Sequence, residues 1–395
     1  MNRTGRESKS ALLAVAALAA AALVACGGGG GNPASAGTAS TFALGHISGF
    51  GSIVVNGVHY DESTAAVEDE DGQAGSAADL KLGSVVAIDA GDIDRSGTQP
   101  SAKADHVKLI GLMKGPIESV GTDSFVVLGQ TVKVTTATVF DDSLSGRLAA
   151  LQIGSVVKVY GTLDAATGIY TATRVEPKAG AAFYGLRGVV AAVDVTAKTL
   201  TIGTMVIDVS AAPLPAGLAV GNLVRLKLQT TRPAGEWVAV SVESAKVGAP
   251  DDQHAEVEGT VTDFTSATSF GVDGLPVDAT GAQFPDGTAG IVSGARVEVE
   301  GSIINGTLVA TKVEVKSNDG DAAAGFEVDG SISAADPANS TITVRGVTVK
   351  YGANTTISNG TAADLTIGVG VEVHGTLGTD GVTLQADSIA IERKS

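Results

Sequence analysis

Histidine and carboxylate side chains that could bind a metal ion stand close together early in the chain. His46 lies in one apolar stretch, and His59 lies on the second arm of a hairpin pattern that follows. If these segments form neighbouring strands, the two imidazoles approach each other, with Asp61 and Glu62 beside them. Imidazole and carboxylate ligands suit zinc or copper. All four residues are therefore candidate metal ligands. The alternative is that the histidines are isolated residues on strands, either on the surface or partly buried, and bind no metal.

Two acidic segments are candidates for binding calcium. The segment Asp92–Gly97 has oxygen donors at positions 1, 3 and 5 and glycine at position 6, as a calcium loop does, but position 12 is Lys103 instead of glutamate. The segment Glu68–Gly72 packs four carboxylates against a glycine. Two interpretations of it stay open: a solvated hairpin tip, or a divalent-ion site. His254, in an expected linker, and His374, on an expected strand, each stand alone.

The sequence contains no recognisable catalytic motif. There is no Gly-x-Ser-x-Gly elbow, so we name no catalytic residue and no cofactor and expect a protein that is not an enzyme. Lys and Arg number 26 against 43 Asp and Glu, a formal net charge of −17. That balance disfavours nucleic acid as a partner and favours cationic or divalent-ion partners. Nine Phe, five Tyr and Trp237 leave few side chains for a base-stacking platform.

The N-terminal segment has the pattern of an export signal. Positive charges precede an apolar run from Ala11 to Ala25, which is shorter than the roughly 20 residues of a membrane-spanning helix. The run ends in Leu-Val-Ala followed by Cys26, the single cysteine of the chain. This ending resembles the lipobox of bacterial lipoproteins. The alternative is a soluble secreted protein with a free thiol.

The lipobox resemblance implies how the protein is anchored. In such lipoproteins the signal peptide, here residues 1–25, is cleaved and the cysteine, here Cys26, carries acyl chains such as palmitate. Several acyl chains anchor a protein stably in a membrane. Gly27, instead of aspartate, follows the cysteine, which by the same resemblance implies the outer membrane, facing either the periplasm or the cell surface. Residues 26–43 then form a glycine-rich linker.

The rest of the chain repeats one unit five times. A Leu-x-(Leu/Ile/Val)-Gly segment followed by alternating apolar residues recurs, with a weaker fourth copy, at intervals of 71, 67, 73 and 74 residues. Within each unit we expect a first strand, a hairpin, a short helical turn, the anchor glycine with a fourth strand, and a fifth strand. The hairpin tips include Asn56-Gly57 and Asp273-Gly274, which suit a type I′ turn. The anchor glycines are Gly83, Gly154, Gly221, Gly294 and Gly368.

This order predicts an all-β protein of five tandem, five-stranded OB-like barrels. The alternative is a beaded array of open sandwiches, and with either fold we expect the units to pack loosely on polar linkers. The predicted units are residues 44–110, 111–178, 183–247, 255–316 and 326–393.

The first unit also resembles a known family. Its segment Gly49–Val58 is similar to the opening motif of a domain of unknown function that occurs, often in tandem, in proteobacterial lipoproteins; the other four units match it less closely. The resemblance implies tandem β-domains and lipoprotein status, but no activity or ligand. We therefore expect a lipid-anchored envelope protein that acts by binding or as a spacer. The alternative is a periplasmic lipoprotein that binds a metal or small ligand in its first unit.

Overall fold

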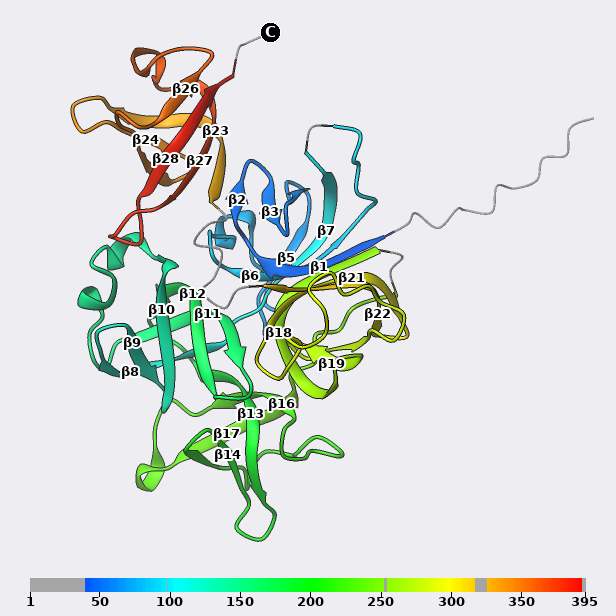
Figure 1. The fold of residues 1–395 in the computed structure, drawn as a ribbon. Coiled ribbons are helices and arrows are strands. Elements are labelled where there is room, and N and C mark those ends of the chain that lie inside the picture. The colour runs from blue at the N-terminus through cyan, green and yellow to red at the C-terminus, as the bar shows by residue number, and fades with distance from the viewer. Residues whose placement is uncertain (1–39, 98, 252–253, 317–324, 393–395) are drawn as a thin grey trace, which may run out of the picture. The chain divides into compact units, whose positions relative to one another are not determined.

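The computed structural model describes residues 40–97, 99–251, 254–316 and 325–392 (Figure 1). Within these ranges the chain is all β, with 28 strands and five short 3₁₀ helices. No helix in the same ranges has the length and apolar character needed to cross a membrane. The predicted signal peptide, Cys26 and most of the predicted linker lie outside the described residues.

The second unit shows the barrel in its simplest form. Its first three strands form a meander, the third strand pairs in parallel with the fifth, and the fourth strand pairs with both the fifth and the first. The sheet is therefore closed, which confirms the predicted OB-like barrel. The strands are β8 (Met113–Val120), β9 (Ser124–Val127), β10 (Gln130–Phe140), β11 (Val156–Asp164) and β12 (Ile169–Pro177).

The third, fourth and fifth units repeat this connectivity, each with a parallel pair between its third and last main strands. The third barrel contains β13 (Tyr184–Asp194), β14 (Thr199–Ile202), β15 (Met205–Asp208), β16 (Leu223–Leu228) and β17 (Trp237–Ser244). The fourth contains β18 (His254–Ser266), β19 (Ser269–Val272), β20 (Leu275–Asp278), β21 (Arg296–Ile304) and β22 (Thr307–Lys316). The fifth contains β23 (Phe326–Asp336), β24 (Thr341–Val344), β25 (Val347–Lys350), β26 (Thr356–Ser358), β27 (Gly370–Leu377) and β28 (Leu384–Ile391).

The first barrel has the same order, but its first strand is split in two. The first segment, β1, pairs with β6, and the second, β2, pairs with β3. The strands are β1 (Thr41–His46), β2 (Gly49–Phe50), β3 (Ile53–Val55), β4 (Val58–Asp61), β5 (Ala66–Glu68), β6 (Val85–Ala90) and β7 (Ser101–Leu109). The 3₁₀ helices of the chain are η1 (Ala77–Asp79), η2 (Asp142–Leu144), η3 (Arg147–Ala150), η4 (Pro233–Gly235) and η5 (Ala362–Asp364).

Backbone geometry explains why glycine recurs at the anchor position. All five anchor glycines have φ between +78° and +91°, a region that L-residues enter only at a cost. Each lies in the tight turn that leads into the fourth strand of its barrel. The hairpin tips behave as predicted, because Asn56 and Gly57 both have positive φ, as a type I′ turn requires.

The barrels are joined by strand pairing, which differs from the loose packing expected from the sequence. In Figure 1, β1 of the first barrel lies beside β18 of the fourth, and the two pair in parallel from Thr41–His254 to Leu44–Val257. The strand β2 pairs with β23 of the fifth barrel, and β8 of the second barrel pairs with β13 of the third. The polar linkers therefore do not separate the units, because unpaired strand edges find partners in neighbouring barrels.

The turns that contain the anchor glycines differ in whether they contact another barrel. In the first barrel Leu82 is 5% exposed and Gly83 lies against the second barrel, where the Thr173 hydroxyl donates to the Gly83 carbonyl at 2.6 Å. The residues that precede the anchor glycine in the second, third and fifth barrels are instead exposed aliphatic side chains. They are Ile153, Val220 and Ile367.

Candidate functional site

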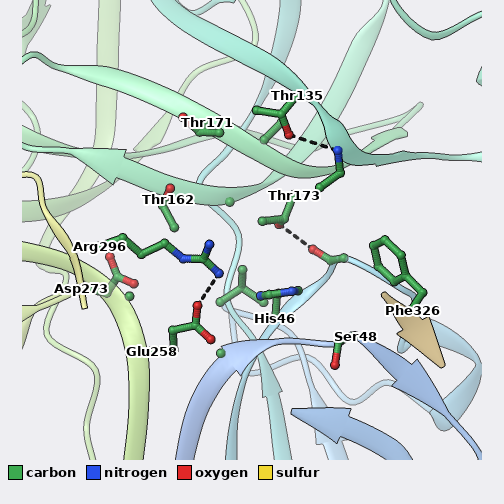
Figure 2. Close-up of a pocket in the computed structure, with 17 residues that line it drawn as sticks. His46, Ser48, Thr135, Thr162, Thr171, Thr173, Glu258, Asp273, Arg296 and Phe326 are labelled. Carbon is green, nitrogen blue, oxygen red and sulfur yellow. Dashed lines mark hydrogen bonds and ion pairs between the residues drawn. The ribbon is translucent and has the colours of Figure 1, made fainter. Parts of the chain in front are cut away.

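The four predicted metal ligands of the first barrel do not form one site. His46 lines a cavity shared with other barrels (Figure 2), whereas the His59 Nε2 atom lies 3.7 Å from Oε1 of Glu327 in the fifth barrel. The Asp61 carboxylate accepts a hydrogen bond from the Ser63 amide, and that of Glu62 accepts one from the Ile53 amide. Among the described residues, none of the four predicted ligands belongs to a group of three ligand atoms close enough to share an ion.

The acidic segment Glu68–Gly72 forms ion pairs with other barrels and is not simply a solvated tip. Oε2 of Glu70 lies 2.8 Å from Nζ of Lys158 in the second barrel. Asp71 forms ion pairs with Arg225 and, at 3.0 Å, with Lys227, both in the third barrel. Two of its four carboxylates are therefore paired with cationic side chains of other barrels of the same chain.

Burial strengthens these contacts between barrels. The side chain of Asp71 is only 8% exposed. Burial by itself raises the pKa of Asp71, but hydrogen bonds from Arg225 and Lys227 outweigh it and hold the pKa below its usual value. Asp71 therefore stays ionised, and the ion pairs of the acidic segment link three barrels.

The calcium-like segment uses one of its carboxylates in a local turn. The Asp94 carboxylate accepts a hydrogen bond from the Ser96 amide at 2.8 Å, as in an Asx turn. Hydrogen bonding to the Ser96 side chain, and then to its amide, lowers the pKa of Asp94. Lys103, at the position where a calcium loop has glutamate, lies in β7, where its backbone is in register with that of Asp61 in β4.

A small cavity lies where the first, second and fourth barrels meet, and Phe326 of the fifth barrel also lines it (Figure 2). Threonine hydroxyls line one side of it, and the ion pair between Glu258 and Arg296 lines another. The cavity volume is about 60 Å³. That space suits a few water molecules, whereas pockets for small molecules span roughly 300–1,000 Å³. The threonines are Thr135, Thr162, Thr171 and Thr173.

Charged groups at the same junction are partly or fully withdrawn from water. Arg187 of the third barrel donates hydrogen bonds to the carbonyls of Ala245 and of Asp273 in the fourth. Burial raises the pKa of the Asp273 carboxyl to about 6, although Arg187 opposes the shift. Burial, followed by the charges of Glu298 and Glu300, raises the pKa of Glu256 to about 7. The hydrogen bond from Arg187 to Asp273 joins the third barrel to the fourth.

One group of the described residues has the geometry of a metal site, and it lies in the fifth barrel. It consists of Glu327, Glu372 and His374, whose ligand atoms all lie within 4.8 Å of one another. His374, expected to stand alone, accordingly has carboxylate neighbours. His254 likewise is not in a linker but is the first residue of β18, paired with Thr41. Sequence reasoning missed this group because Glu327 lies 45 residues before Glu372, although Glu372 and His374 are two residues apart on one predicted strand.

The fold and the repeats define a protein of tandem OB-like barrels, and the comparisons agree with this class. The family model "Domain of unknown function (DUF5666)" matches residues 114–176, 258–314 and 329–390, within the second, fourth and fifth barrels. The chain therefore contains tandem copies of a domain of unknown function. We expected the family resemblance to be strongest in the first unit, which is not among the matched segments.

The other two comparisons add little. The comparison with curated proteins found no match. Among solved structures, one titled "drosophila Unr CSD456" matches 42% of this chain and 79% of its own, at 15% sequence identity and a TM-score of 0.15. A TM-score this low supports no conclusion about function.

Proposed function

We propose that the protein is a bacterial lipoprotein anchored in the outer membrane through Cys26. Its five barrels pack together into one non-enzymatic binding module, here called the binding body. The anchor is supported by the residues Leu-Val-Ala-Cys at the end of the apolar run. The domains are copies of a domain of unknown function, so no activity is carried over from a relative.

The contacts of the first barrel favour a binding body over a spacer. A repeat array that serves as a spacer gains length because each repeat contacts only its neighbours. Here the first barrel pairs with the fourth and the fifth, which are not its neighbours in the sequence. Its acidic segment also contacts the second and third barrels. This set of contacts is the observation that carries the proposal.

The anchor is tested by fractionating cells that produce the full chain. The wild-type protein should be found in the outer-membrane fraction and should incorporate a labelled fatty acid. Cys26→Ala should lose the label and leave the membrane fraction. Gly27→Asp is the matched variant, because it keeps the cysteine and, by the sorting rule of enteric lipoproteins, should move the labelled protein to the inner membrane. Persistence of Cys26→Ala in the membrane would contradict the anchor.

A metal- or small-ligand-binding role is the second candidate function. The observation that favours it is the approach of His59, a predicted ligand in the first barrel, to Glu327 of the fifth. In this second candidate, His59 acts together with Glu327 of the fifth barrel and not with the other predicted ligands of the first.

A further inference from the structure

Two strands of the fifth barrel place metal-binding side chains on one face. In the antiparallel pair of β23 and β27, Glu327 lies directly opposite His374, and Glu372 is two residues before His374. Residues two apart on a strand point to the same side. The intervening side chain, Val373, is fully buried, whereas Glu372 is half-buried and His374 is exposed. The carboxylates and the imidazole therefore face outward together.

The distances between these groups suit a shared ion. The ligand atoms of Glu327, Glu372 and His374 all lie within 4.8 Å of one another, and His374 Nε2 is 2.9 Å from Glu372 Oε1. Ligands around tetrahedral zinc, bound at about 2.0–2.2 Å, are about 3.3 Å apart. Small side-chain movements, freest at the exposed His374, would bring the three groups to that spacing.

The first barrel contributes to the same place. His59 Nε2 lies 3.7 Å from Glu327 Oε1, and both side chains are only 14% exposed. Pairing of Gly49 with Glu327, between β2 and β23, holds the backbones together at this point. The Gln99 side chain of the first barrel donates to Glu372 Oε1 at 3.3 Å, as residues that orient metal ligands do.

We propose that Glu327, Glu372 and His374 bind one divalent transition-metal ion, such as Zn²⁺, and that His59 of the first barrel positions Glu327 and so forms a bridge between this site and the first barrel. Two carboxylates neutralise the charge of the ion, and the imidazole selects a transition metal over calcium, which prefers oxygen ligands alone. Three protein ligands of this kind, with water in the fourth position, are within the range that zinc uses. This inference deepens the second candidate function, on which it rests, and does not depend on the lipid anchor.

The test uses the untagged full-length chain in detergent, stripped of metal with a chelator. Titration with Zn²⁺ at pH 7, followed by calorimetry, should give one site per chain. His374→Gln and Glu327→Gln should each weaken binding at least tenfold, since even residues that only support a ligand cost 10–100-fold when changed. His59→Gln should weaken it as well. Co²⁺ should give the absorption bands of a tetrahedral ion in the wild type, and these bands should be lost or weakened in the three variants.

A matched control separates this site from ordinary histidine–carboxylate contacts. His106 has Glu68 and Asp89 each at 3.6 Å, but on opposite ring nitrogens, so the three cannot close on one ion. His106→Gln should therefore bind Zn²⁺ as the wild type does. Equal binding by wild type and His374→Gln, or equal loss in His106→Gln, would overturn the site. Unchanged binding in His59→Gln would overturn the bridge. Circular dichroism of the metal-free variants checks that each has folded.

Discussion

The Nζ atom of Lys158, in the second barrel, lies 2.8 Å from Oε2 of Glu70, in the first, with only 6% and 15% of the two side chains exposed. Although burial opposes the charged form, Glu70 holds the pKa of Lys158 above its usual value. Glu70, an acidic residue that could be expected from the sequence to face solvent, therefore lies in the contact between two barrels.

The pair predicts a specific stability effect. Lys158→Ala leaves the Glu70 carboxylate buried without its partner, which should lower the free energy of unfolding by about 2–4 kcal/mol, near the lower end of values for broken buried pairs. Lys312→Ala is the control, because Lys312 pairs with Glu300 at 2.9 Å but is 33% exposed, and it should cost less than about 1 kcal/mol. Urea denaturation measures both. Equal costs would mean that the Lys158 pair is not an interface contact.

The raised pKa of Glu256 predicts a dependence of stability on pH. Its pKa in the folded chain is about 7, against an ordinary value of 4.5 for a glutamate, so the folded state binds the proton more tightly than the unfolded state. Stability from this group is therefore fully present below pH 4.5 and falls as pH rises toward 7.

Glu256→Gln should remove that dependence. At pH 8 the variant should be more stable than the wild type by about 2–3 kcal/mol, because one pKa unit corresponds to about 1.4 kcal/mol, and near pH 4 the two should be alike. Asp71, with its lowered pKa, has the opposite sign and is present in both proteins, so it cancels from the comparison. Thermal unfolding across this pH range is the measurement, and a variant less stable than the wild type at pH 8 would refute the assignment.

Two anchor glycines predict different costs for the same substitution. Gly83 and Gly154 both have strongly positive φ, so alanine should cost about 1–2 kcal/mol at either from backbone strain. At Gly83 a Cβ atom would also lie 2.4 Å from the Thr173 carbonyl oxygen, whereas at Gly154 nothing lies within 4 Å. Gly83→Ala should therefore be about 1–3 kcal/mol more destabilising than Gly154→Ala. Identical unfolding curves would show that the first anchor turn does not dock on the second barrel.

The sequence predicts each barrel well because its signals are local. The anchor glycine, the hairpin tip and the alternation of apolar residues all act within one unit, and the structure confirms them at Gly83 and at Asn56-Gly57. The short helical turn predicted before the fourth strand of each unit includes, in the second barrel, the 3₁₀ turn Arg147–Ala150.

Contacts between units are not readable in the same way. Glu70 and Lys158 are 88 residues apart, and nothing near either one identifies the other. The proximity of His374 to Glu327 is not visible in the sequence, because it depends on the pairing of the first and fourth strands of the barrel. The predicted strand order includes that pairing. A comparison of the outward-facing residues on those two strands would therefore have identified Glu327 as a neighbour of His374.

Differential scanning calorimetry of the full chain tests most directly whether the five barrels behave as one body. Strand pairing and buried ion pairs between barrels couple their unfolding, so we predict fewer transitions than barrels and, in Lys158→Ala, separation of a transition for the first barrel. Five independent transitions in the wild type, unchanged in Lys158→Ala, would contradict the account.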